Sequence, residues 1–276
     1  MKKELVGYNV KSVETPVTLE VWEYCNNPVI YSINAGDSEK NRKDQIEKNE
    51  ESKKEIASEY YDKVKRKQKH YEAMRWQIAR IVDCNFDENT KFVTLTFKEN
   101  IQDIAYTNTE FEKFIKRFNY KLYHVKKAQL KYLAVWERQK RGAIHYHVIF
   151  FDLPYVKNKD LQRYWGQGFV KINKVDVDSK ENRGRYVSKY FSKDIDEKEY
   201  KQKAFFKSQK LKMPIVTHKY QDEMQDFSDS TVVYTKEYTR RVPDFYTPSG
   251  TGGELQFKES VVRYTKIRKD NKNELE

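Results

Sequence analysis

The sequence contains little cysteine and no long apolar run. Only Cys25 and Cys84 occur among its 276 residues, and their wide separation provides neither the paired spacing of a zinc site nor a disulfide framework. No apolar run approaches the roughly 18 residues that a membrane-spanning helix needs, and the opening MKKELVGYNV lacks the apolar stretch of a secretory signal. These absences predict a cytoplasmic protein with no membrane partner.

A nucleotide-binding motif is missing as well. The glycine-rich stretch PSGTGG at 248–253 lacks the Gly-Lys-Ser/Thr ending of a phosphate-binding loop, so it is interpreted as a flexible turn. No internal repeat is present either. The sequence therefore indicates no ATP-driven motor of its own.

Basic and aromatic residues are abundant instead. Lysine and arginine total 54 against 42 aspartates and glutamates, which gives a net charge of +12 and a pI near 9.3, and aromatic residues make up 14% of the chain. Such an excess of positive charge favours a polyanionic partner. Nucleic acid is the first candidate, and an anionic membrane surface is the alternative.

Composition divides the chain into three predicted regions, 1–80, 81–215 and 216–276. The first combines N-terminal strands with a long charged helical segment. Alternating helical and strand patterns make the second a compact core. The third is a strand-rich extension, with strands expected in STVVYTKEYTRRV and GELQFKESVVRYTKI.

Within the first region, residues 17–33 predict two short strands broken at Asn26-Asn27-Pro28. The stretch 37–69 is almost entirely charged or amide-bearing. It is interpreted as a solvated helix or linker, and a DNA-contacting arm is the alternative. Helical spacing of the apolar residues then predicts that the following segment packs on the core through Met74, Ile78 and Ile81.

The core region opens with a strand and an amphipathic helix. In FVTLTF at 92–97, Val93, Leu95 and Phe97 alternate with threonines, which is the pattern of a strand with one buried face. A capping box of Thr109 and Glu112 predicts the start of a helix. Its apolar face carries the spacing i, i+3, i+4 and i+7, namely Phe111, Phe114, Ile115 and Phe118.

The rest of the core continues this alternation. Strands are predicted at 130–138 and 143–151 around a tight turn, then a short helix at 160–165, a strand in GFVKINKVDV and a helix in RGRYVSKYFSKDI. A tight turn between adjacent strands requires antiparallel pairing. The pattern therefore predicts one sheet with helices packed on it, an α+β fold.

Two histidines stand out in the strand AIHYHVIFF. Alternate side chains of a strand share a face, so His145 and His147 point to one side and Tyr146 to the other. If the turn centres near Arg141, Glu137 lies opposite His145 on the same face. Two imidazoles and a carboxylate suit a catalytic divalent ion. A purely structural role for the histidines is the alternative.

A second group lies in RGRYVSKYFSKDI. At helical spacing, Tyr186, Lys189, Tyr190 and Lys193 share one face. A phenol with a pKa near 10 is a weak nucleophile at neutral pH, and an adjacent lysine lowers that pKa or neutralises charge on a phosphate. The group therefore predicts a tyrosine that attacks a phosphodiester. In the alternative interpretation, the tyrosines are amphipathic packing residues and the lysines are solvated.

These motifs together resemble the HUH endonuclease superfamily, and within it the rolling-circle replication initiators (Rep proteins) of plasmid and small-phage type. FVTLTF, HYH and YVSKY match the family's TLTF-like strand, His-hydrophobic-His strand and Tyr-x-x-Lys helix in order, over about residues 90–215. The resemblance implies a central antiparallel sheet of about five strands with flanking helices (HUH/RRM-like), N- and C-terminal extensions, and an endonuclease core at 81–215.

The resemblance also implies roles for individual residues. His145, His147 and Glu137 would bind Mg²⁺ or Mn²⁺, Tyr186 and Tyr190 would be nucleophiles, and Lys189 would be the motif lysine. The substrate would be single-stranded or cruciform origin DNA, cut to leave a 5′-phosphotyrosine and a free 3′-OH. Host helicase and polymerase would complete replication.

Three other functions fit the sequence. A single-tyrosine HUH transposase or mobilisation nuclease would use Tyr186 alone. A non-catalytic nucleic-acid-binding module would bind through a basic sheet with stacking aromatics and need no metal. A scaffold built on the charged segment would lose oligomerisation when residues 37–69 were deleted.

Overall fold

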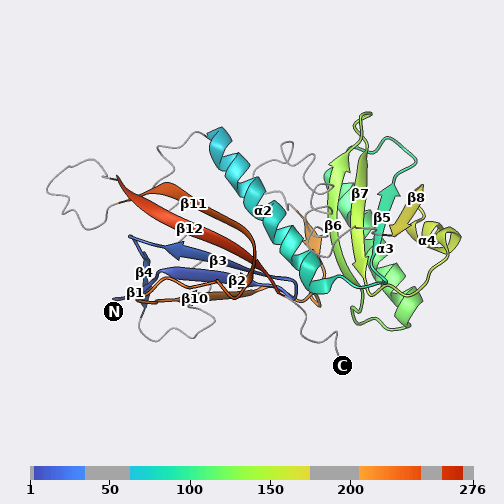
Figure 1. Cartoon of the computed structure of the whole chain (residues 1–276). Helices are drawn as coiled ribbons and strands as arrows, with labels where there is room; N and C mark the ends of the chain where they lie inside the picture. The colour runs from blue at the N-terminus through green and yellow to red at the C-terminus, as the bar shows by residue number, and fades with distance from the viewer. Residues whose placement is uncertain (1–2, 35–62, 175–204, 244–256, 270–276) are drawn as a thin grey trace, which may run out of the picture. The chain divides into compact units, whose positions relative to one another are not determined.

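The computed structural model describes residues 3–34, 63–174, 205–243 and 257–269. The chain forms two compact units: unit 1 comprises residues 1–69 and 214–276, and unit 2 comprises residues 70–213. Within the described residues, each unit contains one five-stranded antiparallel sheet, and three helices accompany them (Figure 1). The α+β class with terminal extensions is therefore confirmed.

The sheet of unit 2 has the strand order β8-β5-β7-β6-β9, and all its neighbours are antiparallel. The chain enters it through two helices and leaves it at the edge strand β9. The five strands are β5 (Lys91–Thr96), β6 (Lys131–Arg138), β7 (Ile144–Phe151), β8 (Val170–Lys174) and β9 (Phe206–Lys207).

One face of this sheet packs against α3 (Ile104–Tyr123) and α4 (Asn158–Trp165). The predicted helical stripe is confirmed: Phe111, Phe114 and Phe118 are buried, and Ile115 is partly buried against the same cluster. Burying each phenylalanine stabilises the fold by roughly 2–3 kcal/mol. The sheet contributes the alternate residues that the sequence predicts, together with a tryptophan from α4: Val93, Leu95, Ile144, Tyr146, Val148, Phe150 and Trp165.

The predicted start of α3 is wrong. Asp103 is the N-cap, and its carboxylate accepts hydrogen bonds from the backbone N–H groups of Ala105 (2.8 Å) and Tyr106 (3.2 Å). Thr109 lies inside the helix and its hydroxyl donates to the carbonyl of Ala105, one turn earlier. An aspartate caps a helix as well as a threonine does, so the earlier cap sets the boundary.

The other face of the sheet is covered in part by α2 (Lys63–Asn85). Met74, Ile78 and Ile81 are buried as predicted. They form a second apolar cluster with the sheet residues Leu133, Val135, Ile149 and Phe151 and with Leu211. None of the helices in the described part of the chain is long and apolar enough to cross a membrane.

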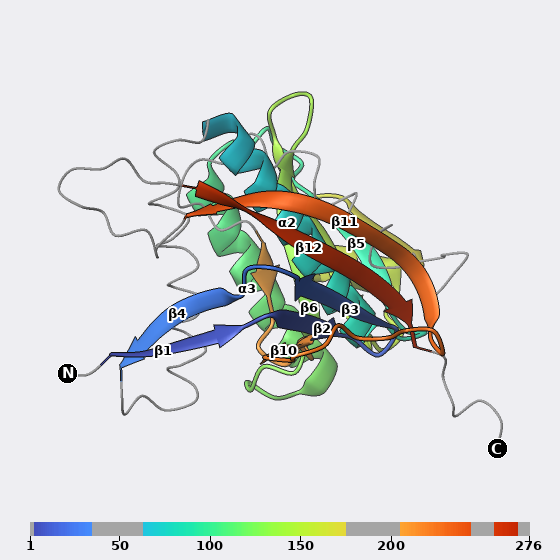
Figure 2. The same ribbon diagram turned by 60° about the vertical axis from the view of Figure 1, so that its left-hand side comes forward.

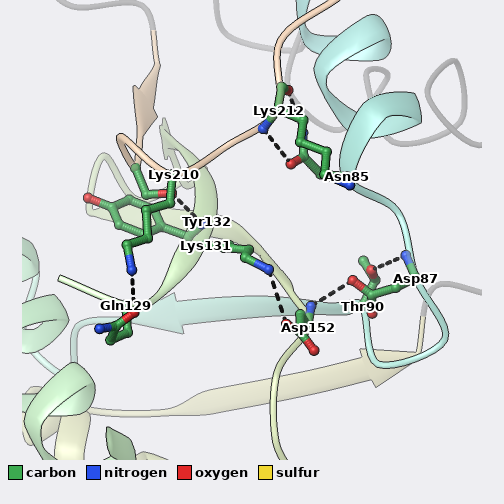
Figure 3. A network of polar contacts seen from close by, with 10 residues as sticks. Asn85, Asp87, Thr90, Gln129, Lys131, Tyr132, Asp152, Lys210 and Lys212 are labelled. Carbon is green, nitrogen blue, oxygen red and sulfur yellow. Dashed lines mark hydrogen bonds and ion pairs between the residues drawn. The ribbon is translucent and has the colours of Figure 1, made fainter. Parts of the chain in front are cut away.

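Polar contacts hold the chain segment around β9 in place (Figure 3). Asn85, at the end of α2, accepts a hydrogen bond from the backbone N–H of Lys212 and donates to its carbonyl, both at 2.8 Å. The carboxylate of Asp87 accepts from the backbone N–H of Asp152 at 2.7 Å. Because these bonds engage main-chain groups, they fix the positions of the segments whatever side chains those segments carry.

Two glycines adapt the backbone at the ends of the strands. Gly142 closes the β6–β7 hairpin with a φ of +84°, a conformation that favours glycine. Gly168, with a φ of +155°, passes so close to the neighbouring strand that a Cβ would lie 2.4 Å from the carbonyl oxygen of Thr96. Only glycine allows this approach between the start of β8 and the end of β5.

The main sheet of unit 1 joins strands from both ends of the chain in the order β10-β2-β3-β12-β11 (Figure 2). A two-stranded sheet, β1 with β4, accompanies it, so the predicted break between β3 and β4 at Asn26-Asn27-Pro28 is confirmed. The strands are β1 (Lys3–Tyr8), β2 (Val10–Glu14), β3 (Thr18–Tyr24), β4 (Val29–Asn34), β10 (Ile215–Lys219), β11 (Thr231–Pro243) and β12 (Phe257–Arg268).

A buried ion pair fixes one face of this sheet. Glu23 on β3 is buried, and Arg263 on β12 donates to it at 2.6 Å. Both residues also bind the backbone of Gln225, so the loop before β11 is attached to this face. The hydrogen bond from Arg263 outweighs partial burial and raises the pKa of its guanidinium.

Asn119 organises the connection from α3 to β6, and its replacement is expected to destabilise unit 2. The buried side chain accepts from the backbone N–H groups of Gln129 and Leu130 and donates to two loop carbonyls. Asn119→Ala leaves these groups unpaired, so the free energy of unfolding should fall by about 2–4 kcal/mol. Urea denaturation measures this, with the exposed Asn100→Ala as control. Equal stability of the two variants would contradict the role given to Asn119.

Candidate metal centre

The β6–β7 hairpin brings together three residues that sequence analysis singled out as metal ligands. Its register pairs Glu137 with His145, as predicted from a turn near Arg141. Residues directly opposite in an antiparallel pair share a face, and His147 lies two residues further along the same face of β7. The hairpin geometry alone therefore places two imidazoles beside one carboxylate.

The three side chains converge on one point. The Nε2 atoms of His145 and His147 are 3.0 Å apart. The Oε2 atom of Glu137 lies 2.9 Å from Nε2 of His147 and 3.6 Å from Nε2 of His145. Ligands at right angles around an ion with bonds of about 2.1 Å are about 3 Å apart. The donor atoms present thus fit a divalent cation.

Burial and charge keep the carboxylate ionised. The side chains of His145, His147 and Glu137 are only 12%, 13% and 17% exposed. Partial burial by itself raises the pKa of Glu137, but hydrogen bonds from the two histidines and their positive charge outweigh it and lower that pKa to about 2. At neutral pH the site therefore presents a negative oxygen and two nitrogen donors, the set that a metal ion requires.

Two residues of β5 complete the surroundings of His147. The hydroxyl of Thr94 lies 3.2 Å from Nδ1 of His147, and the ring of Phe92 stacks on the imidazole with centroids 5.4 Å apart. When Nδ1–H donates to Thr94, the lone pair of Nε2 is free for a metal. Sequence analysis gave these residues no role, although the alternation in FVTLTF already placed the threonines on a separate face from the apolar core.

The two histidines differ in this respect. Among the described residues, Nδ1 of His145 is buried and has no hydrogen-bond partner. The orientation of His145 therefore depends on packing and on its contacts with His147 and Glu137, whereas that of His147 is also held by Thr94.

Tyr146, between the histidines, belongs to the opposite face. Its ring stacks on Phe111 at 4.6 Å with an interplanar angle of 5°, and its hydroxyl donates to Asn108 at 2.7 Å. Burial raises the pKa of this phenol. A neutral, hydrogen-bonded tyrosine in the core is therefore a packing residue, which anchors the strand that carries the ligands.

The predicted nucleophile group lies outside the described residues. Tyr186, Lys189 and Tyr190 fall in 175–204, so their relation to the metal centre stays a prediction. The described residues on either side belong to β8 and β9, which are the two opposite edges of the sheet in unit 2.

Comparisons with known proteins agree with this region of the chain. Residues 90–195 match the family of replication-associated proteins of the ORF2 type. The phasyl DNA replicon protein arp of Escherichia coli is 30% identical over 149 residues, which cover 45% of this chain and 50% of that protein. The chain thus spans about half the length of the curated relative that it matches. No solved structure gives a significant match.

These similarities point to DNA replication and suggest a replication initiator, and with it DNA binding. All six predicted site residues, the three ligands and the group at 186–190, lie within the matched range 90–195.

Metal binding by the three ligands is expected to stabilise the protein. At about a hundred times its dissociation constant, Mn²⁺ should contribute roughly 2.7 kcal/mol, which raises the melting temperature by about 5–10 °C. The double variant His145→Ala/His147→Ala should lose this rise. Differential scanning fluorimetry with Mn²⁺ and with EDTA measures it. His70→Ala, at an exposed position elsewhere, is the control, and an undiminished rise in the double variant would contradict the site.

Thr94 is expected to hold His147 in the tautomer that binds a metal. Thr94→Val has nearly the same shape but cannot accept from Nδ1, so Mn²⁺ affinity should fall about tenfold. Thr94→Ser keeps the hydroxyl and should restore most of the affinity. Titration calorimetry measures both, and equal affinity of the valine variant and the wild type would exclude this positioning role.

Proposed function

We propose that the protein is a replication initiator that nicks single-stranded origin DNA with a tyrosine nucleophile. The observation that carries the proposal is the convergence of Glu137, His145 and His147 on one sheet face, inside a segment similar to replication-associated proteins. The strands and helices around this face make up the endonuclease core, to which we assign residues 81–215.

The three ligands would hold Mg²⁺ or Mn²⁺, which supplies positive charge to a scissile phosphate and stabilises the developing oxyanion. Glu137 provides the negative charge that retains the cation, because its carboxylate stays ionised. Thr94 keeps the ring of His147 in position through its 3.2 Å contact with Nδ1. The helix α2 shields the adjacent half of the face from water through Ile149 and Phe151.

Tyr186 would act as the nucleophile. Its phenolic oxygen forms a bond to phosphorus while the bond from phosphorus to the 3′ oxygen breaks, and the phenolic proton is lost as the leaving oxygen gains one. The products are a 5′-phosphotyrosine and a free 3′-OH that a polymerase can extend. The bond energy is retained in the phosphotyrosine, so strand transfer needs no ATP.

Lys189 and Tyr190 complete the proposed machinery. The lysine would neutralise charge on the phosphate or lower the pKa of a neighbouring phenol. Tyr190 would attack the regenerated junction and end a round of replication. The partners of this reaction would be single-stranded or cruciform origin DNA and the host helicase and polymerase.

A covalent protein–DNA product tests the proposal. Labelled single strands from the DNA surrounding the protein's own gene are incubated with the protein, with and without Mn²⁺, and separated on a denaturing gel. The wild type should give a metal-dependent band that survives SDS. Tyr186→Phe, or the double variant with Tyr190→Phe, should lose it, because phenylalanine has no nucleophilic oxygen.

The single variants separate the related functions. Full repeated strand transfer in Tyr190→Phe would favour a single-tyrosine transposase or mobilisation nuclease. Tyr155→Phe, at a highly exposed position outside the motif, is the matched control and should behave as the wild type. No adduct with any strand, together with persistent binding on native gels, would refute nicking and favour a non-catalytic binding module.

A further inference from the structure

The sheet of unit 1 has a face rich in aromatic and basic side chains that the metal centre does not use. Residues directly opposite in antiparallel strands share a face. The registers of the four strand pairs therefore align one transverse row across all five strands. That row alternates in chemistry: Lys236 on β11, Tyr264 on β12, Trp22 on β3, Lys11 on β2 and His218 on β10. We refer to this side of the sheet as the aromatic face.

Rings on the aromatic face are close to one another and partly open to solvent. Trp22 and Tyr264 have centroids 5.0 Å apart, and Tyr234 lies 6.1 Å from Tyr264. On β11, Tyr234 is 51% exposed and Tyr238 is 39% exposed. A soluble sheet that presents tyrosine rings outward has an apolar surface suited to stacking with another flat ring.

Positive charge surrounds these rings. Lys236 and Lys266 flank Tyr264 on neighbouring positions of the same face. Arg240, two residues from Tyr238, lies 4.5 Å above the ring of Tyr24, and among the described residues its Nε atom has no hydrogen-bond partner. The carboxylate on this part of the sheet, Glu20, is buried and accepts a hydrogen bond from Tyr264.

The opposite face of the same sheet has a different character. There the basic residue Arg263 is paired with Glu23, and the loop at Gln225 is bound to both. Glu237 on β11 lies opposite Arg263 in the strand register. Positive charge is thus balanced on that face and in excess on the aromatic face, which gives the sheet one side complementary to a polyanion.

We propose that the aromatic face binds single-stranded DNA. Unpaired bases can stack on the exposed rings of Tyr234 and Tyr238, and the phosphates then lie within reach of Lys236, Lys266 and Arg240. Duplex DNA cannot bind in this way because its bases are already stacked on one another. The choice of DNA rather than RNA rests on the proposed function, whereas the preference for a single strand rests on the face itself.

This surface lies outside the segment that matches the replication-associated family, since that match covers residues 90–195. The aromatic face is built from strands at 10–24, 215–219 and 231–268. It would therefore add a second grip on DNA that is independent of metal and of the nucleophile.

The test is binding of fluorescein-labelled oligothymidylate to the full chain in EDTA, followed by anisotropy. The double variant Tyr234→Ala/Tyr238→Ala should bind more weakly, by about tenfold for each ring removed. Tyr234→Phe/Tyr238→Phe keeps both rings and should bind within about twofold of the wild type. Thr239→Ala, on the same strand but on the opposite face, is the matched control and should change nothing.

A second variant keeps the test decisive if the alanine pair unfolds. Lys236→Ala/Lys266→Ala should reduce the slope of log affinity against log salt concentration by about 0.7 for each phosphate that is no longer neutralised. An unchanged slope, or undiminished binding by a folded alanine pair, would overturn the proposal. Equal competition by duplex DNA would do the same, and tighter binding of oligouridylate would overturn the assignment to DNA.

Failure of this proposal and failure of the nicking function give different results. The anisotropy assay contains no metal and detects no covalent product. A wild type that forms no adduct but needs Tyr234 and Tyr238 for binding would refute nicking and support the aromatic face. Adduct formation combined with binding that ignores both tyrosines would refute the aromatic face and leave nicking intact.

Discussion

The alternation of side chains along β7 is the constraint on which both the core and the candidate site depend. Ile144, Tyr146, Val148 and Phe150 are fully buried under α3, so the intervening histidines must point the other way. A shift of one residue would exchange the two sets. The hairpin turn closed by the bond from Gly142 N–H to the carbonyl of Gln139 fixes the register. The hydrophobic core thereby holds the imidazoles in position.

The helix α2 divides the second face of that sheet into a dry part and a functional part. Its apolar stripe covers Ile149 and Phe151, further along the strand from the histidines. The ligands remain between 12% and 17% exposed. This intermediate burial reconciles two requirements, because full burial would exclude a phosphate and full exposure would weaken electrostatic interactions with it.

Sequence patterns predicted the elements that have a strong local signal. The stripe on α3, the strand β7 and the opposition of Glu137 to His145 all follow from periodicity and turn length. The start of α3 was missed because Thr109 and Glu112 fit a capping box equally well, and only the folded chain shows that Asp103 caps the helix. Thr94 was missed as a partner of His147 because the pairing of β5 with β7 joins residues 53 positions apart.

Short strands and long-range pairing were the least predictable parts. β9 has two residues and therefore no period to detect. In β2 the sequence VKSVE leaves three positions half-buried and two buried, so its pattern is weak. Nothing local in the sequence indicates that β3 pairs with β12 or β2 with β10, because such partners are selected by the packing of the whole sheet.

The interleaving of both chain ends in the sheet of unit 1 has a consequence for biosynthesis. Unit 2 consists of one continuous stretch, 70–213, whereas unit 1 needs residues from both sides of it. During translation unit 2 can fold as soon as it emerges, but β2 and β3 must wait for β10, β11 and β12. Unit 1 therefore closes only after these last strands have been made, which makes it a late checkpoint that a truncated product cannot pass.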